Sequence, residues 1–166
     1  MDTVFKILFA LFLILEAWFY QEENQDWDRQ RQLLKDADNL ATHAAAQLVY
    51  PDTLNEGQLL IDEDAAKAKF LQTLQQNLGL NEQLLPKTGS PLYSEVKLVY
   101  FQVIDERTVT FPYLYENETY HLAKYLRGPA VVAVVETEHP KWIQRLTEKE
   151  PIRVPAIQEY AKSSST

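Results

Sequence analysis

The chain has 166 residues, 46% of them hydrophobic, and it carries a formal net charge of −8 with a pI near 4.9. Such apolar content excludes a disordered chain, because it is enough to form a packed core. The acidic balance argues against nucleic acid as a partner, since phosphate binding needs clustered Lys and Arg. The absence of Cys excludes disulfides, thiolate zinc sites and a cysteine nucleophile.

Residues 1–20 are predicted to be a transmembrane anchor. The run over residues 7–20 is apolar apart from Glu16, and it approaches the roughly 20 residues of a full span. The basic side chain before the run and the acids after it predict a single-pass protein of the cell membrane, with its N-terminus in the cytoplasm and its head outside. The side chains expected at the two membrane interfaces are Lys6, Trp18, Phe19 and Tyr20.

Two other interpretations of this segment stay open, a cleaved signal peptide and a buried helix of a soluble protein. Residues 1–6 make a poor basic n-region, and no small-residue cleavage site follows the apolar run, so we expect an uncleaved anchor. Glu16 either marks the water interface or meets a polar partner inside the membrane.

Residues 21–50 are predicted to continue the helix as an amphipathic stalk that ends at Val49, before Pro51. Apolar residues spaced three and four apart form one stripe that is rich in Ala. Small side chains let a sheet or a neighbouring helix approach closely. The residues expected to pack during assembly are Glu16, Ala37, Leu40, Ala41, Ala44, Ala45 and Leu48, and we expect a bulky residue at position 41 to lower assembly without unfolding the head.

Residues 51–166 are predicted to form an extracytoplasmic head of the α+β class, with the long helix packed on an antiparallel β-sheet. We expect a loop over residues 51–57, a short strand over 58–61, and a helix capped by Asp62 and ended at Gly79. Alternating apolar residues then predict a meander of strands over 95–105, 108–115, 119–126 and 130–138. A helical turn is expected over 140–145, and a last strand or extended arm over 152–160. In the first strand, alternation places Val96, Leu98 and Tyr100 on one face and Val99, Phe101 and Val103 on the other.

No catalytic constellation is found in the sequence. There is no Gly-x-Ser-x-Gly and no Gly-rich phosphate loop, and His43, His121 and His139 lack metal-ligand spacing. We therefore expect no catalytic residues, no metal site, no cofactor and no enzyme activity.

The layout resembles that of type IV pilin-like proteins, and more narrowly the TadE/TadG-like minor pilins, or pseudopilins, of tight-adherence systems. Two stretches carry the resemblance: the apolar residues 11–15 followed by Glu16-Ala17, and Leu40-Ala41-x-x-Ala44-Ala45-Ala46 in the stalk. The resemblance implies a structural subunit of a bacterial surface appendage or secretion system that assembles through its N-terminal helix. Its partners would be the membrane, other pilin-like subunits or an assembly platform, and a homo-oligomer is one form of such an assembly. The alternative is an anchored extracytoplasmic module that binds or senses a ligand or the cell wall without catalysis.

Overall fold

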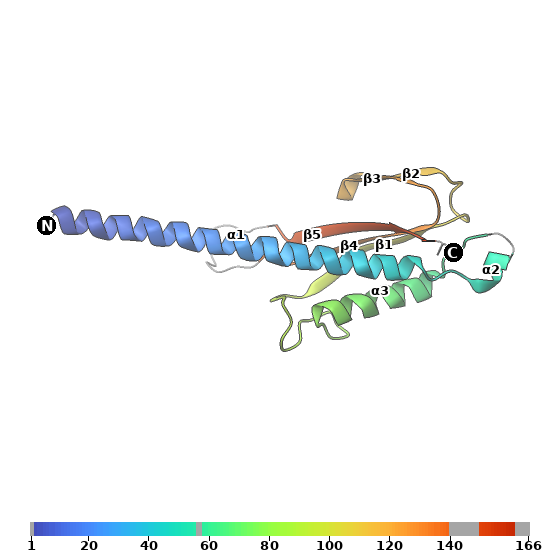
Figure 1. Ribbon diagram of the computed structural model, residues 1–166, viewed down its shortest axis with the longest axis horizontal. Helices are drawn as coiled ribbons and strands as arrows, with labels where there is room; N and C mark the ends of the chain where they lie inside the picture. The colour runs from blue at the N-terminus through green and yellow to red at the C-terminus, as the bar shows by residue number, and fades with distance from the viewer. Residues whose placement is uncertain (1, 56–57, 140–149, 162–166) are drawn as a thin grey trace, which may run out of the picture.

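The computed structural model describes residues 2–55, 58–139 and 150–161. A single long helix, α1 (Asp2–Ala46), runs through both the predicted anchor and most of the predicted stalk. Its first half extends alone, and its second half lies against the head (Figure 1). The head contains α2 (Pro51–Asn55), α3 (Glu63–Leu78), β1 (Val96–Ile104), β2 (Tyr113–Asn117), the 3-10 turn η1 (Glu118–Tyr120), β3 (Leu122–Leu126), β4 (Ala130–Thr137) and β5 (Ile152–Glu159). The predicted α+β class, with a long helix packed on an antiparallel sheet, is confirmed.

Helix α1 ends at Ala46, earlier than the predicted end at Val49. Beyond it the backbone pairs with a distant segment instead of continuing the helix: Tyr50 N donates to Leu60 O at 2.9 Å, and Asp62 N donates to Leu48 O at 2.8 Å. The strand predicted over residues 58–61 is reduced to this short bridge. The loop predicted over residues 51–57 instead opens with α2, because Pro is well tolerated at the first position of a helix.

Helix α3 has both of its predicted ends. Asp62 is the N-cap, and its side chain accepts a hydrogen bond of 3.0 Å from the Ala65 N–H. Gly79 adopts the left-handed conformation with φ of 63°, which a residue without a Cβ reaches easily. The apolar stripe of α3 packs against the inner side of α1, with Phe70 and Leu74 fully buried.

The main sheet has the strand order β1-β4-β5, and both pairings are antiparallel. The two strands predicted over residues 108–115 and 119–126 do not join it in a meander. They become the separate β2-β3 hairpin, which lies over the sheet on the side away from α3 (Figure 1). Both faces of β4 are therefore covered, one by α1 and α3 and the other by the hairpin, which explains its dense run of Val.

A bulge in β1 corrects the predicted faces of that strand. The register shifts between Leu98 and Tyr100, so that Val99 is an extra residue. After the shift, Phe101 joins Leu98 in the core beneath α1 and α3, whereas Tyr100 joins the core beneath the hairpin. Strict alternation, which placed Tyr100 with Leu98, is wrong at this point because one inserted residue inverts every later side chain.

Asp105 joins the end of β1 to the segment that precedes α3. Its carboxylate is 1% exposed and accepts from Ile61 N at 3.2 Å and from the Arg107 guanidinium at 2.6 Å. Arg107 in turn donates to Ile61 O at 2.8 Å. These bonds explain why the chain around Ile61 is held beside the sheet although it is not a strand. The last predicted strand is confirmed as β5, and the turn predicted over residues 140–145 lies outside the described residues.

Candidate functional site: the exposed length of the N-terminal helix

The first half of α1 has no packing partner within the described chain. Every side chain of residues 3–22 is exposed, although the most apolar 18-residue window has a mean hydropathy of 1.8. At 1.5 Å per residue, twenty residues of helix are about 30 Å long, which is the thickness of the bilayer core. This helix is long and apolar enough to span a membrane, in agreement with the predicted anchor. Over residues 3–22, its apolar side chains are not covered by the described part of the head.

The predicted interface residues lie at the two ends of this exposed length. Trp18, Phe19 and Tyr20 are 56%, 47% and 67% exposed, and they lie at the end of the exposed length that is nearer the head. Lys6 is exposed near the opposite end. The aromatic and basic side chains are therefore accessible to a membrane interface, as their amphipathic character requires.

Glu16 is exposed on the same length of helix, in a shallow groove that it shares with Phe19, Tyr20 and Glu23. Within the described residues it forms no hydrogen bond and no ion pair. A carboxylate in this position is surrounded by apolar neighbours on its own helix, so any polar partner has to come from water, a lipid headgroup or another chain.

The Ala stripe of the stalk is divided by the structure. Ala37, Ala41 and Ala45 are buried in the head's own core beneath α3 and the sheet. Ala44 and Leu48 are half-buried, whereas Leu40 is 49% exposed on the outward side. Small residues allow a close approach by a sheet or by a neighbouring helix. Here the buried alanines pack against α3 and the main sheet of the same chain. A bulky residue at Ala41 would therefore disturb the head itself.

Three polar residues of α1 are buried at the same interface, and sequence reasoning missed them. Gln30 is 2% exposed, and Asp38 and Thr42 are fully buried. Thr42 Oγ1 donates to Asp38 Oδ1 at 3.4 Å, while Asp38 Oδ2 and Gln30 Nε2 have no partner among the described residues. Burial raises the pKa of Asp38 to about 8, an effect that the Thr42 hydrogen bond only partly opposes. Their positions on the same helical stripe as Leu34 and Ala41 were the available signal.

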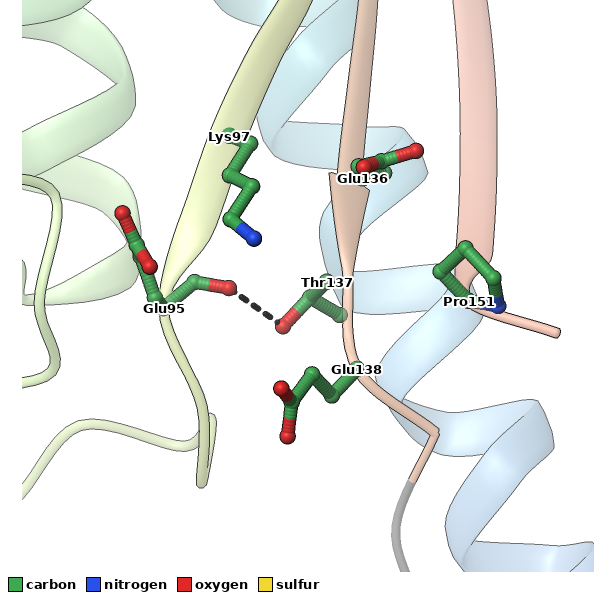
Figure 2. Close-up of a pocket in the computed structure, with 6 residues that line it drawn as sticks. All are labelled: Glu95, Lys97, Glu136, Thr137, Glu138 and Pro151. Carbon is green, nitrogen blue, oxygen red and sulfur yellow. Dashed lines mark hydrogen bonds between the residues drawn. The ribbon is translucent and has the colours of Figure 1, made fainter. Parts of the chain in front are cut away.

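Surface depressions are found on the described part of the head. One lies where β1 begins and β4 ends and is lined by Glu95, Lys97, Glu136, Thr137, Glu138 and Pro151 (Figure 2). Thr137 Oγ1 donates to Glu95 O at 2.9 Å, and Glu136 is bound by Arg153 at 2.8 Å. The carboxylates of Glu95 and Glu136 point away from one another in Figure 2. In the described part of the chain, no three His, Cys, Asp or Glu side chains are grouped so as to hold a metal ion.

No protein-family model, curated protein or solved structure matches this chain. The features of the chain that bear on its function are the two halves of α1, one exposed and apolar, the other built into the head.

Proposed function

We propose that this protein is a membrane-anchored structural subunit that assembles through its N-terminal helix, as part of a bacterial surface appendage or secretion apparatus. The first half of α1 would lie in the membrane before assembly and against other helices after it. The head would be carried outside the membrane, with the N-terminus on the cytoplasmic side.

The supporting observation is the continuity of α1 between two environments. Its second half is fixed in the head by Leu34, Ala41 and Ala45, all fully buried, so the exposed first half is held in one direction relative to the head. A flexible tether would suffice for an anchor alone. A continuous helix transmits position from anchor to head, which a subunit of an ordered assembly needs.

Glu16 supplies the polar contact that would distinguish an assembled helix from a lone anchor. Helices in a membrane gain little from hydrophobicity alone, because lipid tails are as apolar as their side chains. Packing and interhelical hydrogen bonds drive their association, and a carboxylate on an apolar helix is most stable where such a bond is made. We expect a polar group of a neighbouring subunit to bind Glu16.

The experiment is to express the full-length Glu16→Ala variant in cells that contain the assembly machinery. The amount in the membrane and the amount in the sheared surface fraction are both measured. Interhelical polar contacts in membranes contribute roughly 0.6–2 kcal/mol, so the assembled amount should fall by about threefold to thirtyfold. The membrane amount should stay the same, because removing a charge does not weaken insertion.

The matched control is Glu116→Ala, the same substitution at an exposed position of the head. It should leave both fractions unchanged. The proposal is contradicted if Glu16→Ala assembles as well as the natural chain, or if alkaline carbonate releases the natural chain from the membrane.

A further inference from the structure

The loop that joins α3 to β1, residues 79–95, exposes two large apolar side chains. Leu85 is 44% exposed and Tyr93 is 66% exposed; this segment is called the α3–β1 loop below. It lies at the end of the head that is nearer the exposed half of α1 (Figure 1). Apolar side chains at this end of the head therefore face in the same direction as the predicted anchor.

The exposure does not come from a loosely built loop. The Asn81 side chain accepts a hydrogen bond of 2.9 Å from Leu85 N, and Asn81 N donates to Leu85 O at 2.9 Å. Ser90 Oγ donates to Leu78 O, the end of α3, at 2.7 Å. Leu92 is 3% exposed and belongs to the main core. The backbone of the loop is held by these contacts, so its outward side chains project from fixed positions.

A strained residue directs Leu85 outward. Leu84 has the left-handed backbone conformation, with φ of 60°, which is unfavourable for a residue with a Cβ. In this turn Leu84 packs against the main core, whereas Leu85 is exposed to solvent. Strained backbone persists where the surrounding structure fixes it, and it gathers at functional sites. The turn therefore separates a leucine that the fold uses from one that the fold of the described chain does not use.

The path of α3 sets the height of the loop along α1. Helix α3 begins beside the end of α1, and its 16 residues run back along α1 for about 24 Å. At the other end of the loop, Thr137 Oγ1 donates to Glu95 O at 2.9 Å. His139, two residues after Thr137, stacks on Trp27 of α1 with ring centroids 6.2 Å apart. The end of the loop next to β1 is thus about level with Trp27.

This height brings the loop close to a membrane that contains the anchor. Trp27 is seven residues beyond Tyr20, where the predicted anchor ends, so the loop is about 10 Å beyond that point. The headgroup layer extends about 5–7 Å from the hydrocarbon core. A tilt of about 20°, the average for transmembrane helices, lowers a point about 10 Å from the helix axis by about 3 Å. An ordinary tilt of α1 toward α3 therefore places the loop at the headgroup layer.

We propose that the α3–β1 loop is a second membrane contact, in which Leu85 and Tyr93 enter the headgroup layer beside the anchor and hold α1 tilted toward α3. A tyrosine suits this layer, because its ring is apolar and its hydroxyl group reaches water. The inference rests on the proposed function, because it requires the first half of α1 to lie in the membrane. It adds the orientation of the head before assembly.

The charges of the loop identify the kind of lipid surface. Glu82, Lys87 and Glu95 are all exposed, so the loop has no excess of positive charge with which to attract anionic lipids. Its contact depends on apolar side chains that enter a zwitterionic headgroup layer, and such binding scales with buried apolar area. The contact should therefore be insensitive to salt, because salt screens charges only.

The test measures the depth of a fluorescent probe on the full-length protein in phosphatidylcholine vesicles. The natural chain has no Cys, so Thr88→Cys, at an exposed position of the loop, carries a single fluorophore. A lipid with a nitroxide on its headgroup quenches fluorophores in the headgroup layer. The probe at position 88 should be quenched several-fold more strongly than the same probe at the exposed Asp52 of α2, at the opposite end of the head (Figure 1). Low and high salt should give the same result.

Removing the two apolar side chains tests whether they make the contact. With Leu85→Ser and Tyr93→Ser together, quenching at position 88 should fall to the level seen at position 52. The head should melt at the natural temperature, because both residues are exposed. The matched control is Leu114→Ser, since Leu114 is 51% exposed on the hairpin, away from α3. It should leave the quenching at position 88 unchanged.

A second probe, at Leu8→Cys in the apolar half of α1, separates this inference from the proposed function. If the probe at position 8 is quenched by a nitroxide in the acyl chains and the probe at position 88 is not quenched from the headgroups, the inference is wrong and the anchor stands. Quenching at position 88 that survives the double serine change, or that requires phosphatidylglycerol and low salt, also overturns the inference. If neither probe is quenched, both proposals are wrong.

Discussion

Asp38 is the residue whose environment departs furthest from what its chemistry prefers. Its carboxyl group is fully buried, with one oxygen near Thr42 and the other without a partner among the described residues. The elements that pack on α1 place no charge opposite it: the acids and lysines of α3 are exposed. On β4 and β5, the half-buried Glu136 pairs with the exposed Arg153, and Glu159 pairs with Lys124 beside the hairpin. Desolvation therefore dominates, and it favours the protonated form.

This burial makes the stability of the head depend on pH. Burial raises the folded-state pKa of Asp38 to about 8, above the ordinary carboxyl value of 3.8, so the native state holds the proton that the unfolded chain has lost between these values. The free energy of unfolding should fall as pH rises from about 4 to about 8, by at most ~1.4 kcal/mol per pH unit. Above the folded pKa it should level off.

Asp38→Asn should remove this dependence, because the amide cannot ionise. At pH 8 the variant should be more stable than the natural chain by about 2 kcal/mol or more, and at pH 5 the difference should be much smaller. Denaturant unfolding at the two pH values measures both. The exposed Asp36→Asn change is the control and should alter stability by less than ~0.5 kcal/mol at either pH. If the free energy of unfolding changed with pH in the same way for the natural chain and for Asp38→Asn, the pKa of Asp38 would not be raised by folding.

At the scale of elements, the apolar pattern of α1 does not show which face of the helix is buried and which is exposed. Ala41 and Leu40 are adjacent in the sequence and both belong to the predicted packing stripe, yet Ala41 is fully buried and Leu40 is 49% exposed. A stripe of spacing three and four is wide enough to include both. The positions of α3 and β5 determine which edge of the stripe is buried, and long-range contacts set those positions.

Substitutions at these two positions should separate folding from assembly. Ala41→Leu adds three carbons where α1 meets the core, and overpacking of this kind costs about 1–3 kcal/mol of unfolding free energy. Leu40→Ala is at an exposed site and should change stability by less than ~0.5 kcal/mol, while lowering the assembly proposed for α1. Unfolding followed by circular dichroism measures the first effect, and the amount of protein in the sheared surface fraction measures the second. Equal destabilisation by both changes would contradict the assignment of the two faces.

At the scale of the whole molecule, the head is complete without the exposed part of α1. Among the described residues, burial in α1 begins near Trp27 and Gln30, and residues 3–22 contribute no buried side chain. The second half of α1, by contrast, forms one side of the main core together with α3 and the face of the sheet that includes Val131 and Val154. The length of α1 that is apolar enough to span a membrane and the length that forms the core of the head are thus different parts of one helix.

A chain that begins at residue 21 should therefore fold as a soluble head. Its melting temperature should lie within about 3 °C of that of the full-length protein, a difference of about 1 kcal/mol or less at this size. A chain that begins at residue 36 loses Leu34 and Gln30 from the core and should melt far lower or fail to fold. Calorimetry of the two shortened chains distinguishes them, and equal stability would show that the second half of α1 is not part of the core.

Features that depend on neighbouring residues were determined by the sequence itself. The apolar length of α1, the Asp62 cap, the Gly79 end and the Val-rich strand β4 all follow from local spacing and backbone preference. The tertiary structure decided the rest: the early end of α1 at Ala46, the bulge at Val99, the hairpin folded over the second face of the sheet and the burial of Asp38. Each of these depends on contacts between segments far apart in the chain, where hydrogen bonds and burial outweigh the local preference of the residues involved.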